Sequence, residues 1–209
     1  MFDVIKKNGA TLALFACAST GVVAVTHYLT EDSIKEQENA QLRKTLSAVV
    51  PNDLHDNQLY QNCVNVNNSL LGTTSDVPIY IATLDSQITA YAIESYAPDG
   101  YTSPIKLLIG LNSDLNVTGV RVLNHQETPG LGDLIDIRVS DWVLSFNGKT
   151  VTPDNGNEWK VKKDGGEFDQ FTGATITPRA VVKAVKNTIE LMQTPDFTQS
   201  IAKAPKCKG

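Results

Sequence analysis

Two loops of this sequence combine glycines with hydroxyl or acidic side chains in a way that could bind a ligand. The first loop, residues 125–133, reads HQETPGLGD and directly follows a β-branched segment. Pro129-Gly130 is a turn signal, and glycine lets a ligand approach the backbone because it has no Cβ atom. A tight turn into a helix that starts near Leu131 would explain the same residues without any ligand.

The second loop, residues 169–178, reads DQFTGATITP and leads into the last amphipathic segment of the chain. Thr177 is a good helix N-cap and Pro178 a good first helical residue. The free N–H groups and the positive dipole end of such a helix suit an anion such as a phosphate. Small residues leave the hydroxyl of Thr175 uncrowded. An ordinary capped helix is the alternative interpretation.

Composition excludes several classes of protein. The 209 residues include 18 Lys+Arg and 23 Asp+Glu, which gives a net charge of −5 and argues against nucleic acid as a partner. The three cysteines form no CxxC or CxxH spacing, so zinc and iron–sulfur sites are not expected. His125 has acidic neighbours but no second histidine nearby, so we expect no metal site there. The sequence leaves open whether Cys63 and Cys207 pair in an oxidising compartment.

Residues 9–29 predict a transmembrane helix. This stretch of 21 residues contains no Asp, Glu, Lys or Arg, and as a helix it would reach about 31 Å, enough to cross a bilayer core of ~30 Å. The alternatives are a signal peptide cleaved after Ala18 and a lipoprotein site at Cys17. The apolar run continues for about ten residues beyond both, which favours an uncleaved anchor.

The charges around this span predict its orientation. Lys6 and Lys7 precede it, whereas Glu31 and Asp32 follow it. The positive-inside rule therefore places the N-terminus in the cytoplasm and the main domain outside, which in a bacterium is the periplasm.

The rest of the chain predicts an α+β fold, with an antiparallel sheet flanked by helices. Residues 30–50 favour a membrane-proximal helix that Pro51 ends. A polar linker, residues 52–76, precedes the strand signals, which are residues 77–84, 88–95, 104–111, 117–123 and 142–146. The last expected helix is 178–193. The predicted organisation is an N-terminus (1–8), a transmembrane helix (9–29), a proximal helix and linker (30–76), a folded domain (77–195) and a C-terminal tail (196–209).

Together, the two loops carry a family resemblance. Residues 169–175 match the Asp-x-x-(Ser/Thr)-Gly-Ala-Thr flavinylation motif, and residues 127–132 match the Glu-Thr-Pro-Gly-Leu-Gly signature of the same FMN-binding domain. With the anchor and the length, the whole chain resembles the G subunits of the Rnf (Rsx) electron transport complexes. Relatives often have glycine where this chain has Thr102 or Ser103.

The resemblance implies an FMN whose phosphate is bonded to the hydroxyl of Thr175, attached by a separate flavin transferase that uses FAD and Mg²⁺. It also implies that Asp169 is read by the transferase. The other residues expected around the cofactor are Thr172, Gly173, Ala174, Thr177, Glu127, Thr128, Gly130, Leu131 and Gly132.

The implied function is that of an electron carrier in a bacterial inner-membrane complex that couples electron flow between ferredoxin and NAD to ion movement. Its partners would be the other subunits, the transferase and membrane lipid, and it would have no soluble substrate of its own. The alternatives are the C subunit of a sodium-translocating NADH:quinone reductase, a membrane-anchored binding module without cofactor, and a flavin enzyme with its own soluble substrate.

Overall fold

The computed structural model describes residues 2–207, without the side chains of residues 3–5 and 32. The chain divides into two compact units, Met1–Leu42 and Arg43–Gly209. Each unit is described by itself.

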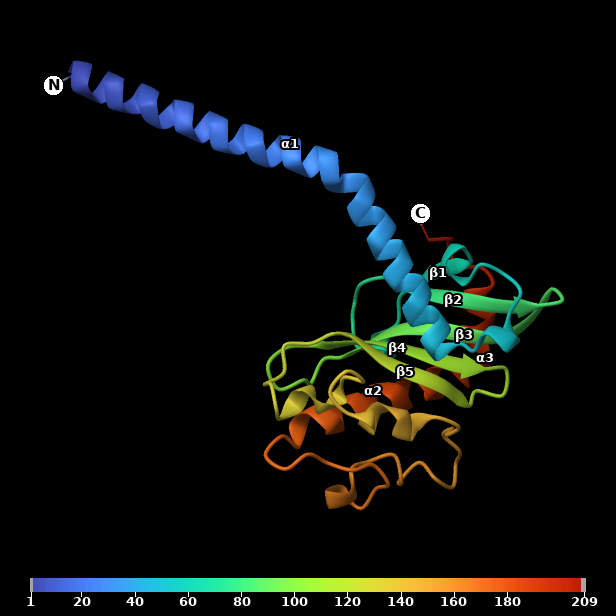
Figure 1. Cartoon of the computed structure of the whole chain (residues 1–209). Helices are drawn as coiled ribbons and strands as arrows, with labels where there is room; N and C mark the ends of the chain where they lie inside the picture. Colours follow the sequence, from blue (N-terminus) through green and yellow to red (C-terminus); the bar gives the residue numbers. More distant parts are fainter. Residues whose placement is uncertain (1, 208–209) are drawn as a thin grey trace. The chain divides into compact units, whose positions relative to one another are not determined.

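The N-terminal helix α1 (Phe2–Val49) is continuous over its 48 residues (Figure 1). Within it, Lys6–Glu31 is long and apolar enough to span a membrane, with a mean hydropathy of 1.7 and none of its most apolar window buried. The expected proximal helix is thus the continuation of the span. No glycine or proline interrupts residues 30–49, and Pro51 follows the last turn.

The second unit is built on a five-stranded antiparallel sheet with the order β1-β2-β3-β4-β5. The strands are β1 (Cys63–Val66), β2 (Val77–Leu84), β3 (Gln87–Ala97), β4 (Ile105–Asn112) and β5 (Val117–Asn124). Each strand pairs with its neighbour in sequence, as expected for a chain of hairpins. The predicted α+β class and antiparallel sheet are therefore confirmed, and four of the strands lie within two residues of their expected bounds.

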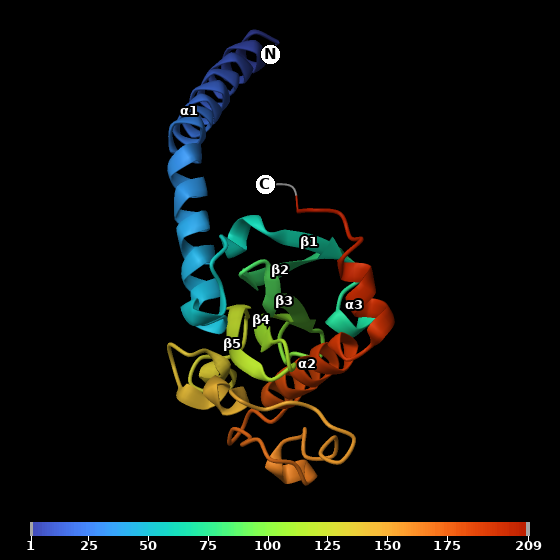
Figure 2. The ribbon, with the colours of Figure 1, turned by 90° about the vertical axis from the view of Figure 1, so that its right-hand side faces the viewer.

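The helix α2 (Ile176–Met192) packs against one face of this sheet, beside β3 and β4 (Figure 2). Side chains alternate across a strand, so every second residue of β4 faces the helix. Those residues belong to the main hydrophobic core and are Ile105, Leu107, Ile109 and Leu111. Burial of this face fixes the first turn of α2 relative to the strand ends.

The opposite face of the sheet receives the last turn of α1, which belongs to the second unit. Gly110 and Gly119 are paired across β4 and β5. A Cβ atom at Gly110 would lie 2.1 Å from the carbonyl oxygen of Val49, so only glycine permits this close approach. The hydroxyl of Thr118 donates a hydrogen bond to the same carbonyl, which satisfies a free group at the helix end.

The predicted strand at residues 142–146 is wrong. It is a 3₁₀ helix, Asp141–Phe146, whose first turn is capped by the Ser140 hydroxyl. Trp142 packs edge-on against Phe146 and Phe171, with ring centroids 5.3 and 5.2 Å apart. Its aromatic and β-branched residues pack in this cluster rather than in a strand, because packing overrides local propensity in so short a segment.

Residues 52–76 and 196–209 are more ordered than a linker and a tail. The first stretch contains the edge strand β1. The second contains most of α3 (Pro195–Ile201) and an extended end that pairs with β1, where the Asn65 amide donates to the Pro205 carbonyl at 2.8 Å. A disulfide joins Cys63 to Cys207 beside this pairing. The tail thus covers a sheet edge that would otherwise expose unpaired backbone groups.

This disulfide should contribute strongly to stability, because it closes a loop with a sequence separation of 144 residues. We expect Cys207→Ser to lower the free energy of unfolding by roughly 2–5 kcal/mol, since the reduced chain gains conformational freedom when unfolded. Urea unfolding of the full-length protein in detergent measures this difference. Cys17→Ser, which removes only the exposed free thiol, is the control and should change nothing. Equal stability of Cys207→Ser and wild type would contradict this role.

Candidate functional site

A cavity of about 200 Å³ lies where the two predicted loops meet at the start of α2. It is lined by three segments of the chain, which contribute Tyr101, then Glu127, Thr128, Leu131 and Gly132, and finally Gly173, Ala174, Thr175, Ile176 and Thr177. Eight of the ten residues that the sequence places around a cofactor line this one cavity. Thr172 and Gly130 are exposed residues of the same two loops and are not among the lining residues.

Thr175 stands at the N-cap position of α2 and is half-buried. Its side chain makes no capping hydrogen bond, and no other hydrogen bond of its hydroxyl is found among the described residues. The helix starts two residues earlier than expected, so Thr177 and Pro178 lie within its first turn. The amides of Ile176 and Thr177 therefore belong to the free N–H groups of a helix start. Thr175, Ile176 and Thr177 all line the cavity, so an unengaged hydroxyl and these amides belong to the same wall.

Thr177 has a structural role that the capping prediction missed. It is almost fully buried, and its hydroxyl donates a hydrogen bond to the carboxylate of Glu127. The side chain is therefore committed within the protein, and its backbone amide is the group left for an anion.

The Glu127 carboxylate connects all three segments of the cavity. It is 5% exposed. One oxygen accepts from the Thr177 hydroxyl, and the other accepts from the Thr102 backbone amide at 3.2 Å. Both donors are neutral, so this acid is held by hydrogen bonds. Burying a carboxylate without partners is very costly, so these two contacts constrain the loops that supply them.

Two glycines of the loops are required by this geometry. A Cβ atom at Gly132 would lie 2.9 Å from both Glu127 and the Thr177 hydroxyl, a distance that side chains do not tolerate. Gly173 has a φ of +82°, and a Cβ atom there would lie 3.4 Å from the Leu131 side chain. At Gly132 the close approach of the loops leaves no room for a side chain, whereas at Gly173 the positive φ is what favours glycine.

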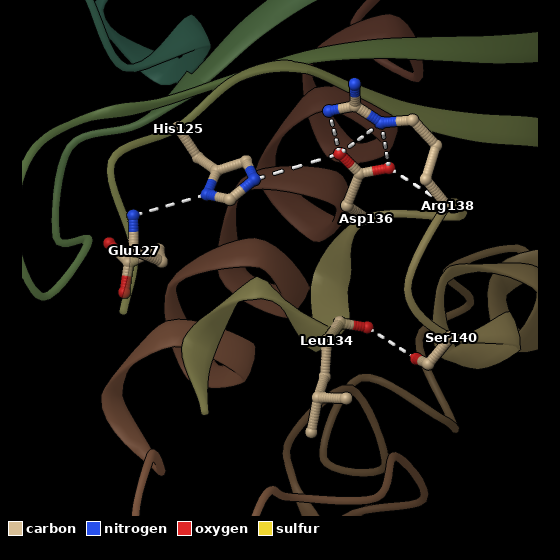
Figure 3. A network of polar contacts seen from close by, with 6 residues as sticks. All are labelled: His125, Glu127, Leu134, Asp136, Arg138 and Ser140. Atoms are coloured by element: carbon tan, nitrogen blue, oxygen red, sulfur yellow. Dashed lines mark hydrogen bonds and ion pairs between the residues drawn. The ribbon is translucent and has the colours of Figure 1, made fainter. Parts of the chain in front are cut away.

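His125 and its neighbours form a polar network behind the first loop (Figure 3). The Glu127 amide donates to His125 Nδ1 at 3.2 Å, and His125 Nε2 lies 3.8 Å from an Asp136 carboxylate oxygen. Asp136 is 3% exposed and accepts two hydrogen bonds from Arg138 Nε, at 3.0 and 2.9 Å. These hydrogen bonds hold the pKa of the Asp136 carboxyl below its usual value. The described residues contain no group of three or more His, Cys, Asp or Glu that could hold a metal ion.

The second loop is held from the outside by Trp142. The indole N–H donates to the Asp169 carbonyl at 2.8 Å, and the ring packs edge-on against Phe171. The Asp169 carboxylate itself is exposed and pairs with Lys162 at 2.6 Å. The resemblance already implied that the segment around Thr102 lies near the cofactor. Trp142 was not expected near the site, because nothing in its local sequence shows which loop it will meet.

Comparison with known proteins gives matches over most of the chain. The model of the FMN-binding domain matches residues 100–190, and the model of the RnfG N-terminal region matches residues 1–49. The G subunit of the ion-translocating oxidoreductase complex of Vibrio cholerae is 58% identical over 210 residues, covering 100% of both chains. The proteins of the same name from Vibrio atlanticus and Aliivibrio fischeri are 60% and 54% identical, covering 91% and 93% of each chain.

Gly132→Ala should destabilise the second unit, because its new Cβ atom would push into Glu127 and Thr177. We expect a loss of roughly 1–3 kcal/mol in the free energy of unfolding, as for other overpacked sites. Gly156→Ala is the matched control, since a Cβ atom there would meet nothing closer than 3.8 Å. Urea unfolding of both variants tests the difference, and equal stability would show that the cavity wall is not tightly packed.

Arg138→Gln should make the thermal stability of the second unit less sensitive to pH in the acid range. The pKa of Asp136 lies below the ordinary value of 3.8 in the folded protein. The ionised Asp136 therefore contributes its full share to the stability of the fold above pH 3.8. This contribution is lost as the pH falls through the pKa of the folded protein. The difference in unfolding midpoint between wild type and Arg138→Gln should be largest at neutral pH and shrink below pH 3.8. Thermal unfolding between pH 7 and pH 3 measures this, and a constant difference would contradict it.

Proposed function

Because this chain belongs to the family of the G subunits of ion-translocating oxidoreductase complexes, we propose that it is an electron-carrier subunit of such a complex, with an FMN at the Thr175 cavity. The observation that carries the proposal is the unengaged Thr175 hydroxyl in a cavity at a helix start. Relatives that cover the full chain are G subunits of this kind, so the alternative of a quinone reductase C subunit is set aside. A binding module without cofactor remains an outcome of the test below.

The FMN is attached to the chain through its phosphate. The Thr175 oxygen attacks the FMN phosphorus of FAD, its proton passes to a base of the transferase, and the phosphoanhydride bond breaks to release AMP. The new phosphodiester keeps one negative charge. The dipole and free amides at the start of α2 stabilise that charge. No oxidant or reductant is consumed in this transfer.

The shape of the site fits a tethered flavin. A cavity of about 200 Å³ is smaller than a usual cofactor pocket of ~300–1,000 Å³, so its residues would hold the phosphate end of the cofactor and leave the ring outside. Three large apolar side chains that line the cavity are exposed, namely Tyr101 at 67%, Leu131 at 40% and Ile176 at 45%. An aromatic ring placed over them would remove apolar surface from water, which is favourable. FMN supplies the electron-transfer chemistry, and the protein positions it and tunes its environment.

The chain crosses the bacterial inner membrane once, with its N-terminus in the cytoplasm and the second unit in the periplasm. The apolar span of α1 supports the single crossing. The disulfide between Cys63 and Cys207 supports the exterior placement, because such bonds form and persist in oxidising compartments. A covalent bond keeps the cofactor from being lost to water at this surface. The subunit passes electrons to neighbouring subunits and has no soluble substrate of its own.

Thr175→Val should abolish FMN attachment, because valine keeps the shape of threonine but has no hydroxyl. The intact mass of the full-length protein from its native host should show one FMN, less one water, on the wild type and none on this variant. Thr74→Val, at an exposed threonine outside both loops and outside the cavity lining, is the control, and it should keep the added mass. If the wild-type protein carries no added mass, the chain is a membrane-anchored module without a covalent cofactor. If Thr175→Val keeps the added mass of FMN, Thr175 is not the attachment residue.

A further inference from the structure

We propose that His125 is a positioning residue for FMN attachment. Its Nδ1 atom holds the Glu127 amide, so that the Glu127 carboxylate keeps the start of α2 in the position that presents Thr175. This inference rests on the proposed function, because it concerns the same hydroxyl. His125 lies outside the cavity lining, so it acts through Glu127.

The hydrogen bonds determine which ring nitrogen of His125 carries the proton. Nδ1 accepts the Glu127 N–H at 3.2 Å, so it has a free lone pair and no proton. In the neutral ring the proton is therefore on Nε2, which faces Asp136 at 3.8 Å. The Asp136 carboxylate attracts this N–H side of the ring and favours the tautomer that the Glu127 amide requires.

The far side of the network is fixed by hydrogen bonds of its own loop. Arg138 binds Asp136 through its side chain, and its backbone amide donates to the same carboxylate at 2.9 Å. The Ser140 hydroxyl donates to the Leu134 carbonyl at 2.6 Å and closes the turn around them (Figure 3). The His125 side chain is 16% exposed and the Asp136 side chain 5%. The ring is thus held on two sides, with little freedom to rotate.

The Glu127 backbone and side chain transmit this constraint to the attachment residue. When the Glu127 amide is held, its side chain can reach the Thr177 hydroxyl and the Thr102 amide together. Thr177 is in the first turn of α2, two residues after Thr175. Gly132 lies against the same carboxylate, so a shift of Glu127 would also move the opposite cavity wall. Loss of the hydrogen bond between the Glu127 amide and His125 should therefore shift the cavity walls, although every residue that lines the cavity is still present.

Three substitutions at this position separate the acceptor from the bulk of the ring. His125→Asn can place its side-chain oxygen where Nδ1 was, and it keeps an acceptor for the Glu127 amide. His125→Gln carries its polar atoms farther along the side chain, near the position of Nε2. His125→Leu keeps the volume and offers no acceptor. A structural role of the ring alone would affect all three variants in similar ways.

Two measurements on the full-length, flavin-free protein test the proposal. The first is the rate of hydrogen exchange at the Glu127 amide, which needs no flavin. The second is the rate of FMN attachment with purified transferase, FAD and Mg²⁺, followed by intact mass. One hydrogen bond of ordinary strength predicts that His125→Leu and His125→Gln exchange this amide about tenfold faster than wild type and accept FMN roughly fivefold to tenfold more slowly. His125→Asn should stay close to wild type in both. Thermal unfolding of each variant controls for loss of the fold.

The outcomes separate this inference from the proposed function. The positioning role is supported if His125→Asn keeps the wild-type rates of amide exchange and FMN attachment while His125→Leu and His125→Gln do not. Equal attachment rates in His125→Asn and His125→Leu would overturn it while the wild type still gains FMN. An unchanged Glu127 amide in His125→Leu would overturn it as well. A wild type that gains no FMN would overturn the proposed function, and with it the attachment role, whatever the amide shows.

Discussion

The geometry of the site depends on one buried carboxylate that is held by neutral donors. Glu127 ends up in the interior only because the Thr177 hydroxyl and the Thr102 amide both satisfy it. This requirement joins a loop after β5, a loop after β3 and the start of α2, which are far apart in the sequence. It also explains why Gly132 cannot carry a side chain. The cavity beside Thr175 is the space that this cross-link leaves open.

The surrounding fold makes that cross-link rigid. One face of the sheet packs against α2 and buries residues such as Ile109 and Val185 completely. The other face receives the end of α1 at Gly110, and the disulfide to Cys207 closes the free edge of the sheet. A helix whose apolar face is buried in this way cannot shift its first turn without unpacking its core. The half-buried Thr175 is thus held beside the cavity on a rigid base.

Much of this could be predicted from the sequence, where the signal is local. The β-branched segment at residues 77–84 predicted both bounds of β2 to the residue, and the two glycine-containing motifs identified both walls of the cavity. Non-local features were missed. The segment at residues 142–146 has the apolar and aromatic composition of a strand, but it forms a 3₁₀ helix in which the Trp142 indole donates to the Asp169 carbonyl. The strand β1 depends on pairing with β2 and the C-terminal tail, which residues 63–66 alone do not reveal. The expected cap at Thr177 failed because its hydroxyl satisfies a buried acid from a distant loop.

The central claim is that Thr175 carries an FMN bonded through its phosphate. The most direct measurement is tandem mass spectrometry of the tryptic peptide 164–179, taken from protein purified from native membranes. This peptide contains all three threonines of the loop, at positions 172, 175 and 177. We predict that the fragment ions place one FMN, less one water, on Thr175. An unmodified peptide, or a flavin on either of the other two threonines, would contradict the account.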